Sequence, residues 1–441
     1  MKTKVNVIGA GLAGAEASYQ LAKRGFIIDL YEMKPDEYSP AHKDSHYAEL
    51  VCSNSLRSND LTNAAGLLKQ ELRLLNSLVI KVADECRVPA GGALAVDRKQ
   101  FSKKITNTLN NNDNINIINK RIDQLDTTKP TIIATGPLTT NKLSKHLKYI
   151  LGQDYLYFFD AAAPIVSADS IDLNNAFVAD RYDKGSGDYL NCPLTKDQYY
   201  NFYTELINAK TATLKDFEQQ KIFEGCMPIE SLAKRGYKAM LFGPLKPVGL
   251  VNPKTNETYY AVIQLRKENT KSDLYNMVGF QTNLTFSEQK RVFGKVPALK
   301  NAEFVRYGVM HRNTFINAPS VLNKYYQLNK HSNIFIAGQL SGVEGYVESI
   351  SSGLYSAINM ANYLNNSPFI TFKTDTAIGA MAKYIANANK NNFQPMNINW
   401  GIIDPLDEPM KNKKLKKELL SKKAINSLVS TIKKGETDGT I

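Results

Sequence analysis

Short apolar runs alternate with a helix-like stretch at the start of the chain. Val5, Val7 and Ile8 predict a buried strand, and residues 15–25, AEASYQLAKRG, predict a helix that ends at a glycine. A second apolar run, FIIDLYE at residues 26–32, predicts another buried strand. The pattern therefore opens with a strand, a helix and a second strand.

Further along, two stretches again place a buried strand before a glycine. Residues 131–137, TIIATGP, predict a strand, and residues 333–361 predict a strand, a glycine-rich turn and a helix of small residues. Residues 67–84 repeat apolar positions at helical spacing and predict one amphipathic helix. Residues 88–98 predict a glycine-rich turn followed by a short strand. Strands and helices thus alternate, which is typical of an α/β fold.

The turn after the first strand carries glycines at the spacing of a dinucleotide-binding motif. Gly9 permits a tight turn, Gly11 lets the backbone approach a pyrophosphate, and Gly14 lets the helix pack closely on the strand. The helix N-terminus then faces the phosphates, and Glu32 can accept a hydrogen bond from a ribose hydroxyl. We predict a dinucleotide site formed by Gly9, Ala10, Gly11, Leu12, Ala13, Gly14 and Glu32.

The two later strands favour FAD over a nicotinamide as that dinucleotide. A strand ending in Ala-Thr-Gly is a feature of two-dinucleotide-fold flavoproteins, and here it brings Thr135 and Gly136 to the strand end. In such flavoproteins a late strand, turn and helix cover the ribityl and pyrophosphate part of the cofactor. That turn contains Gly338 and Gln339 here. Either stretch alone also fits an ordinary strand-to-helix turn, so the prediction depends on their order along the chain.

The segment from about Tyr189 to about Pro319 mixes helices and strands without a dinucleotide signature. We interpret it as an inserted domain that presents a second substrate. The predicted division is 1–188 for the first part of an FAD-binding domain, 189–319 for the insertion, and 320–441 for the second part. The predicted fold class is α/β, a Rossmann-like FAD-binding domain of the two-dinucleotide-fold flavoprotein type interrupted by an α+β insertion domain.

The composition fits a soluble globular protein of more than one small core. The chain has 441 residues, of which 43% are hydrophobic and 22% charged. Its 4 cysteines show no regular spacing, so we expect a reducing, cytoplasmic location. The early strand leaves no room for a signal peptide, and no apolar run is long enough to span a bilayer. We expect neither a membrane partner nor a metal site.

The charge balance suits a polyanionic partner. Lys and Arg number 55 against 42 Asp and Glu, which gives a formal net charge of +13. A Lys-, Asn- and Ile-rich composition also reflects genome base content, and basicity alone does not choose between RNA, DNA and acidic membrane. Residues 411–423, KNKKLKKELLSKK, predict a solvated basic helix or tail that could hold phosphates.

Two cysteines lie in segments that suggest chemistry. Cys52, in LVCSNSLRS, is embedded in small and polar residues that predict an accessible loop, as a reactive thiol requires. Cys226 follows Gly225 in FEGCMPIE, where glycine and proline favour a turn, and Lys234 and Arg235 follow on a predicted helix. Each segment taken alone also fits a packed structural cysteine.

The chain resembles the folate- and FAD-dependent tRNA (uracil-5-)-methyltransferases. The resemblance runs through nearly the whole chain and rests on long phrases: VIGAGLAGAEA, ELVCSNSLRSNDLTNAAGLLKQEL, RVPAGGALAVDR, FEGCMPIESLAKRGY, LFGPLKPVGL, VGFQTNLTFSEQKRVF, FVRYGVMHRNTFINAP and GVEGYVES. It implies FAD as cofactor, methylenetetrahydrofolate as carbon donor, NADH or NADPH as reductant, and a uracil in structured RNA as acceptor. It also implies that Cys52 and Cys226 are catalytic and that His311, in GVMHRN, contacts the folate.

Three functions remain open at this point. The first is methylation of the uridine that becomes 5-methyluridine in the T-loop of tRNA. A paralogue with the same chemistry would act on 23S ribosomal RNA, because the catalytic motifs would look alike. The third is a flavin oxidoreductase of a small molecule with no RNA partner; the basic charge and the lack of a second GxGxxG motif argue against it.

Overall fold

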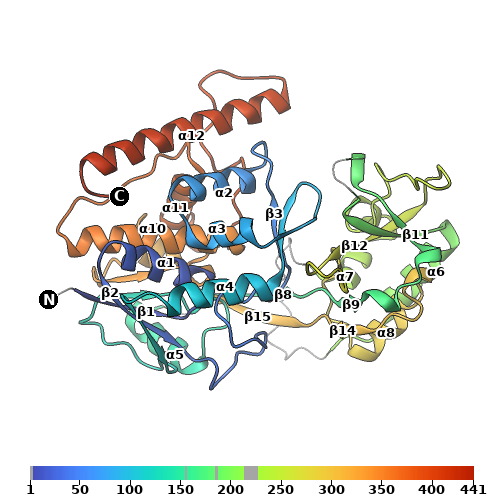
Figure 1. Cartoon of the computed structure of the whole chain (residues 1–441), viewed down its shortest axis with the longest axis horizontal. Coiled ribbons are helices and arrows are strands. Elements are labelled where there is room, and N and C mark those ends of the chain that lie inside the picture. The colour runs from blue at the N-terminus through green and yellow to red at the C-terminus, as the bar shows by residue number, and fades with distance from the viewer. Residues whose placement is uncertain (1–2, 154–155, 184–186, 213–226) are drawn as a thin grey trace.

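The computed structural model describes residues 3–153, 156–183, 187–212 and 227–441. Figure 1 shows two bodies, a larger one that contains both ends of the chain and a smaller one beside it. A two-stranded antiparallel ribbon of β8 (Leu156–Ala161) and β15 (Met310–Phe315) lies where the bodies meet. We call the larger body the dinucleotide domain, and the residues between β8 and β15 the insertion domain.

The dinucleotide domain is built on a parallel sheet of five strands in the order β16-β7-β1-β2-β6. The predicted opening unit is confirmed, because β1, α1 and β2 follow one another as expected. The two later stretches form β7 and β16 as predicted. Strand β7 pairs with β1, and β16 pairs with β7, although the three are far apart in sequence. The bounds are β1 (Lys4–Ile8), α1 (Leu12–Lys23), β2 (Ile27–Glu32), β6 (Ile115–Asn119), β7 (Thr131–Ile133) and β16 (Ile334–Ile336).

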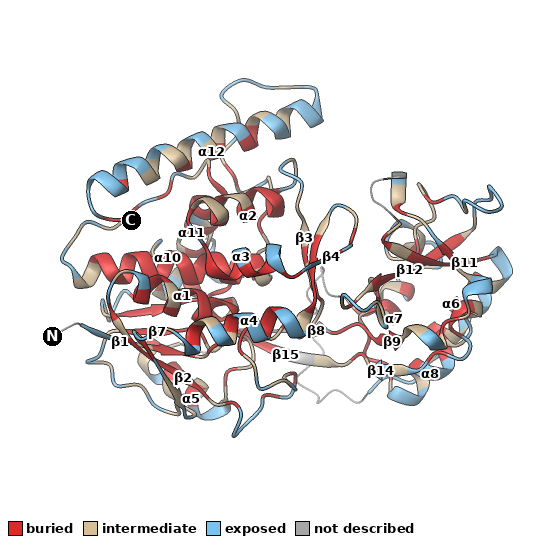
Figure 2. Cartoon of the chain, in the orientation of Figure 1, coloured by how far each residue is buried: buried red, intermediate tan, exposed pale blue. Residues whose placement is uncertain are grey.

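Small residues let two helices pack closely over this sheet. Helix α10 (Tyr346–Leu364) crosses α1, and a Cβ added at Gly353 would lie 2.3 Å from the carbonyl oxygen of Ala13. A contact this short excludes any side chain larger than that of glycine at the crossing. Figure 2 shows that both helices are buried over most of their length, so the core of the domain lies between them and the sheet.

The single helix predicted over residues 67–84 is wrong. The structure has two helices there, α2 (Ala64–Leu74) and α3 (Leu78–Glu85). Asn76 between them has a φ of 57°, which breaks the helix, and the Ser77 hydroxyl then accepts a hydrogen bond from the N–H of Ile80. Apolar residues recur on both sides of the break because both helices bury their apolar residues in the same core.

The insertion domain contains a six-stranded sheet in the order β10-β11-β12-β13-β9-β14. Two of its strands, β9 and β10, precede Tyr189, so the sheet begins before the boundary that the sequence suggested. We therefore propose an insertion that starts near the end of β8. The bounds are β9 (Ile165–Ser167), β10 (Phe177–Val178), β11 (Tyr189–Leu194), α6 (Lys196–Ile207), α7 (Ile229–Ala233), β12 (Ala261–Lys267), β13 (Leu274–Met277), α8 (Phe286–Phe293) and β14 (Phe304–Arg306).

Smaller elements complete the two bodies. A three-stranded antiparallel sheet in the order β3-β5-β4 faces the insertion domain in Figure 1. Among the described residues, no helix is both long enough and apolar enough to cross a membrane. The remaining bounds are β3 (Ser55–Ser58), β4 (Arg87–Val88), β5 (Ala93–Val96), α4 (Arg98–Asn110), α5 (Asn141–Leu151), α9 (Ala318–Val321), α11 (Ala377–Asn387) and α12 (Lys413–Thr437).

Candidate functional site

A cavity opens at the ends of the parallel strands, and it contains about 1170 Å³ of empty space, open solvent included. Such a position, outside the carboxyl ends of the strands, is where open α/β sheets bind their ligands. The structure brings together there all the predicted cofactor residues except Gly14. These lining residues are Gly9, Ala10, Gly11, Leu12, Ala13, Glu32, Thr135, Gly136, Gly338 and Gln339.

The three motif glycines have the different roles that their spacing predicts. Gly9 has a φ of 96°, which makes the tight turn. A Cβ added at Gly14 would lie 1.8 Å from the carbonyl oxygen of Gly9, so this glycine serves the packing of helix on strand and not the cavity. A Cβ added at Gly11 would meet no protein atom within 4 Å. Gly11 therefore leaves open space at the N-terminus of α1, where a phosphate would bind.

Glu32 ends β2 and orients the rim of the cavity. Its Oε2 accepts a hydrogen bond from the N–H of Ala10 at 2.8 Å, and its Oε1 accepts one from the N–H of Lys34 at 3.0 Å. A carboxylate has about four acceptor positions, so two remain for ribose hydroxyls. The residue is thus fixed in place by the backbone and still able to bind a ligand.

The turns after β7 and β16 form the opposite wall. Gly136 and Gly338 have φ angles of 69° and 74°, which favour glycine at both turns. The N–H of Gly338 donates to the hydroxyl of Ser352 at 2.7 Å, and this bond fixes the turn against α10. The side-chain amide of Gln339 donates to the carboxylate of Glu344. These hydrogen bonds fix the turn after β16, while Gly338 and Gln339 still line the cavity.

A segment that sequence reasoning missed folds over the dinucleotide motif. It covers residues 34–49, and five of its residues line the cavity: Lys34, Ser39, His42, Ala48 and Glu49. The N–H of Ala48 donates to the carbonyl oxygen of Ala10 at 2.9 Å, which ties the segment to the glycine loop. The segment has no helical or strand periodicity and no motif that would mark it in the sequence. Its conformation is fixed instead by polar contacts between its own residues.

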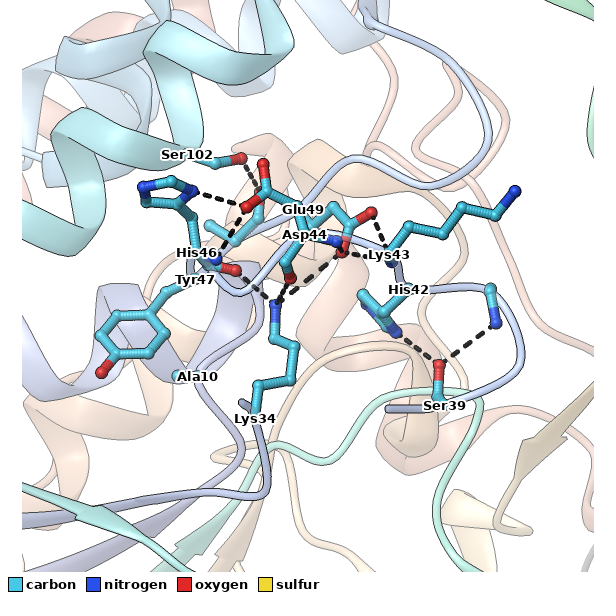
Figure 3. A network of polar contacts seen from close by, with 12 residues as sticks. Ala10, Lys34, Ser39, His42, Lys43, Asp44, His46, Tyr47, Glu49 and Ser102 are labelled. Carbon is cyan, nitrogen blue, oxygen red and sulfur yellow. Dashed lines mark hydrogen bonds and ion pairs between the residues drawn. The ribbon is translucent and has the colours of Figure 1, made fainter. Parts of the chain in front are cut away.

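Lys34 is the centre of those contacts, as Figure 3 shows. Its ammonium group donates to the carbonyl oxygens of Asp44, at 3.0 Å, and His46, and lies 3.8 Å from a carboxylate oxygen of Glu49. Burial lowers the pKa of Lys34, although the nearby carboxylates of Glu32 and Glu49 oppose the shift. A buried ammonium group that binds backbone carbonyls fixes the whole segment beside the cavity.

Cys52 lies at the end of this cavity next to the insertion domain. Its N–H donates to the hydroxyl of Tyr346 at 2.8 Å, and both Tyr346 and the neighbouring Val51 line the cavity. The predicted accessible loop is only partly correct, since Asn54 and Leu56 in the same segment are fully buried. The side-chain oxygens of Ser53 and Asn54 accept hydrogen bonds from Arg266.

The other predicted site residues divide by where they lie. Cys226 lies outside the described residues. His311 lies in β15, and its backbone pairs with Asp160 of β8 at the junction of the two bodies. Cys86 and Cys192 are buried; burial raises the pKa of both thiols, that of Cys192 to about 12, which makes them unreactive. In the described part of the chain, no group of three or more His, Cys, Asp or Glu could hold a metal ion.

The helix after Cys226 is fixed to the insertion domain by a buried acid. Glu230 in α7 accepts hydrogen bonds from the hydroxyl of Thr282 and from the N–H of Asn283, both at 2.8 Å. Lys234 and Arg235, which the sequence placed on this helix, follow its last residue instead. The described chain that continues from Cys226 is therefore a well-anchored part of the insertion domain.

Known proteins match this chain over nearly its whole length. A family model described as "Glucose inhibited division protein A" matches residues 4–368. A methylenetetrahydrofolate--tRNA-(uracil-5-)-methyltransferase TrmFO from Natranaerobius thermophilus is 55% identical over 431 residues, which cover 98% of this chain and 99% of that protein. This chain belongs to the TrmFO family. The TrmFO of Listeria monocytogenes serotype 4b is 54% identical over 428 residues, 97% of this chain and 98% of that protein.

Solved structures agree with the fold. The structure of Aquifex aeolicus GidA matches with a TM-score of 0.71 at 15% identity and covers 100% of this chain and 76% of that one. A second crystal form of the same protein gives a TM-score of 0.69 at 16% identity, over 99% of this chain and 76% of that one. The predicted fold class, a Rossmann-like flavoprotein fold with an insertion, is confirmed for this member of the TrmFO family.

Proposed function

We propose that this protein is an RNA methyltransferase that forms 5-methyluridine in the T-loop of tRNA. Methylenetetrahydrofolate supplies the carbon, FAD is the cofactor, NADH or NADPH is the reductant, and the reaction takes place in the cytoplasm. The observation that carries the proposal is the identity of 54–55% to TrmFO methyltransferases over 97–98% of this chain. The cavity at the glycine motif supports it, because a dinucleotide cofactor fits there.

The residues around the cavity suit FAD. The open space at Gly11 and the N-terminus of α1 would receive the pyrophosphate, and Glu32 would accept the ribose hydroxyls. The turn with Gly338 and the N-terminus of α10 would cover the ribityl part, and Tyr346 and Val51 are the lining residues that would receive the ring system. When bound and reduced, FAD supplies the two electrons that convert a folate methylene group into a methyl group.

Two thiols suit the chemistry at the uracil. Carbon 5 of uracil is a poor nucleophile, but thiolate addition at carbon 6 produces an enolate that makes carbon 5 reactive. We assign this addition to Cys226. Cys52, at the end of the cavity, either acts as a general base at carbon 5 or forms a transient covalent bond near the flavin. The backbone of His311 lies at the junction of the two bodies, where the folate would bind.

An RNA partner is supported by a surface beside the helix that follows Cys226. We call it the α7 surface: Lys234, Tyr237, Lys238 and Phe242. The ring of Phe242 is 81% exposed, and the ammonium group of Lys238 lies 5.5 Å from the centre of the Tyr237 ring. Exposed rings between lysines can stack on unpaired bases while the charges bind phosphates. The α7 surface therefore has the chemistry of a single-stranded RNA contact.

Mapping of the transferred carbon tests the proposal. The protein, reduced FAD and methylenetetrahydrofolate labelled in the methylene carbon are incubated with a tRNA transcript or a 23S ribosomal RNA transcript. We expect label in one uridine of the tRNA T-loop, recovered as 5-methyluridine. Label in ribosomal RNA alone would instead identify the paralogous function, and reoxidation of FAD by a small molecule with no labelled RNA would indicate an oxidoreductase.

The two cysteines are separated in the same assay with an RNA that contains 5-fluorouracil, since fluorine blocks the proton loss that frees the enzyme. Cys226→Ser should form no covalent RNA adduct, because a serine hydroxyl is far less ionised than a thiol at neutral pH. Cys52→Ala should lose methylation but keep the adduct. A stable adduct with Cys226→Ser and none with Cys52→Ala would reverse the two roles.

A further inference from the structure

Arginine side chains from distant parts of the chain hold the segment around Cys52. Arg98, the first residue of α4, donates to the carbonyl oxygen of Leu50, and Arg306, the last residue of β14, donates to the carbonyl oxygen of Val51. Both acceptors lie within two residues of the thiol. Two guanidinium groups are therefore directed at the backbone that carries Cys52.

A third arginine binds the other side of the same segment. Arg266, in β12, donates to the hydroxyl of Ser53 at 2.7 Å and to the side-chain oxygen of Asn54 at 3.1 Å. Its side chain has little access to water, since Arg266 is only 6% exposed. Arg266 and Arg306 both belong to the insertion domain, whereas Arg98 and Cys52 belong to the dinucleotide domain, so the insertion domain supplies two of the three charges.

The charges around the thiol do not cancel. The acid that faces the arginines is Glu268, which is 4% exposed and forms an ion pair with Arg98. Burial raises the pKa of Glu268, and the guanidinium groups of Arg98, Arg266 and Arg306 oppose this shift. The hydroxyl of Tyr346 also faces Cys52, and burial raises its pKa, so it is neutral. These contacts place three guanidinium groups, one paired carboxyl group and one neutral phenol around the segment that carries Cys52.

Positive charge close to a thiol favours its ionised form. A charge of opposite sign within about 4–6 Å typically lowers the pKa of an acid by about 1–3, and poor access to water strengthens this effect. Arg306 interacts electrostatically with Cys52 itself and is not paired to Glu268 by an ion pair, unlike Arg98. Of the three arginines, Arg306 is therefore the one whose charge we expect to lower the pKa of the thiol most.

We propose that Arg306 is a positioning residue of the insertion domain that keeps Cys52 ionised, so that the thiol is reactive only when the two bodies are joined as they are here. The proposal rests on the proposed function in taking Cys52 as the thiol that acts beside the cofactor. A movement of the insertion domain would withdraw Arg306 from Val51 and change the reactivity of Cys52. The reactivity of the thiol and the placement of the second body are therefore linked.

The pH dependence of thiol alkylation tests this role without relying on methylation. The FAD-loaded full chain carries Cys226→Ser, and because Cys86 and Cys192 are buried, iodoacetamide reports on Cys52, followed by mass spectrometry of its peptide. The midpoint of the rate against pH is expected below the ordinary thiol value of about 8.5. Adding Arg306→Gln, which keeps a donor for Val51 but removes the charge, should raise the midpoint by about one pH unit or more.

Two further variants separate charge from structure. Arg306→Lys should keep most of the shift, since it preserves the charge. Arg291→Gln makes the same change in net charge within α8, where Arg291 pairs with Glu205 and Glu288, and should leave the midpoint unchanged. Bound FAD is measured for each variant. If Arg306→Gln loses FAD, Arg306→Met replaces it, since methionine also lacks the charge, with the same expected direction.

The outcomes distinguish this proposal from the proposed function. An unchanged midpoint in the FAD-loaded Arg306→Gln or Arg306→Met variant, or an equal shift with Arg291→Gln, would overturn the role of Arg306 even if the unsubstituted chain methylates tRNA. A shifted midpoint in a chain that methylates no RNA would leave Arg306 in place and reject the methyltransferase assignment.

Discussion

Gly11 and Gly14 are three residues apart, and a side chain would do different damage at each. At Gly14 a Cβ would overlap the carbonyl oxygen of Gly9 at 1.8 Å, so the helix could not pack on the strand. At Gly11 a Cβ would enter the cavity and touch no protein atom within 4 Å. Binding and folding can therefore be separated within one motif.

Gly11→Val should fold and lose FAD. The added side chain occupies the space in which the pyrophosphate would approach the backbone. We expect affinity for FAD to fall about tenfold or more, a cost of roughly 1.4 kcal/mol for each factor of ten, while the melting temperature of the cofactor-free protein stays near that of the unsubstituted chain. Flavin absorbance after gel filtration and thermal unfolding measure the two effects.

Gly92→Val is the matched control for that change. Gly92 is exposed in the turn before β5, and a Cβ there also meets no atom within 4 Å, but the residue does not line the cavity. It should retain FAD. Full FAD occupancy in a folded Gly11→Val protein would reject this cavity as the cofactor site.

The glycine motif could be predicted from the sequence because its residues lie close together in the chain and each has one physical task. The environment of Cys52 could not, since its partners Arg266 and Arg306 lie more than two hundred residues away in sequence. The polar residues around Cys52 predicted an accessible loop, whereas in the structure arginine side chains bind this segment. Only the folded arrangement shows which charges reach the thiol.

At the scale of elements, the sequence predicted the spacing of the apolar residues and the side they bury better than the points at which a helix is interrupted. The pattern over residues 67–84 identified the buried apolar positions but not the turn at Asn76, because α2 and α3 bury their apolar residues in the same core. The early strands of the insertion sheet were also missed: β9 and β10 are short, with bounds Ile165–Ser167 and Phe177–Val178. Strands β7 and β16 are also short, but each leads into a glycine turn that marks it in the sequence, and β9 and β10 do not.

Glu71 links helix α2 to helix α11 through a buried carboxyl group. It lies in α2 and accepts hydrogen bonds from the N–H groups of Ala377, at 2.7 Å, and Ile378, at 2.9 Å, at the start of α11. Burial raises the pKa of Glu71 from 4.5 to about 8. The folded state therefore holds this proton more tightly than the unfolded state, and the associated stability is present below the unfolded pKa and lost as the pH rises through about 8.

Glu71→Gln should flatten that pH dependence, because glutamine does not titrate. Between about pH 5 and pH 8 we expect the unsubstituted chain to lose on the order of 2–4 kcal/mol more stability than the variant. Thermal unfolding at several pH values measures it, with the exposed Glu436→Gln as control. Equal slopes for Glu71→Gln and the unsubstituted chain would mean that Glu71 is ionised in the fold, held by its two N–H donors.

At the scale of the whole molecule, the basic C-terminal segment is part of the folded body. The sequence predicted a solvated helix or tail over residues 411–423, and α12 is indeed a helix, but it extends to Thr437 and buries Leu420, Ala424 and Leu428. In Figure 1, α12 begins on the side of the insertion domain and ends at the far side, near the C-terminus. Its lysines therefore differ in their distance from the junction of the two bodies.

An RNA whose uridine reaches the junction of the two bodies should meet the α7 surface first. Lys234→Gln with Lys238→Gln should weaken RNA binding and lower the slope of log affinity against log salt, by about 0.7–0.9 for each phosphate that the variant no longer neutralises. Lys433→Gln with Lys434→Gln removes two equally exposed charges at the far end of α12 and should leave the slope unchanged. Filter binding of tRNA over a salt series measures both. A slope that falls only with the α12 pair would place the RNA along α12 and leave the rings of Tyr237 and Phe242 without a base to stack on.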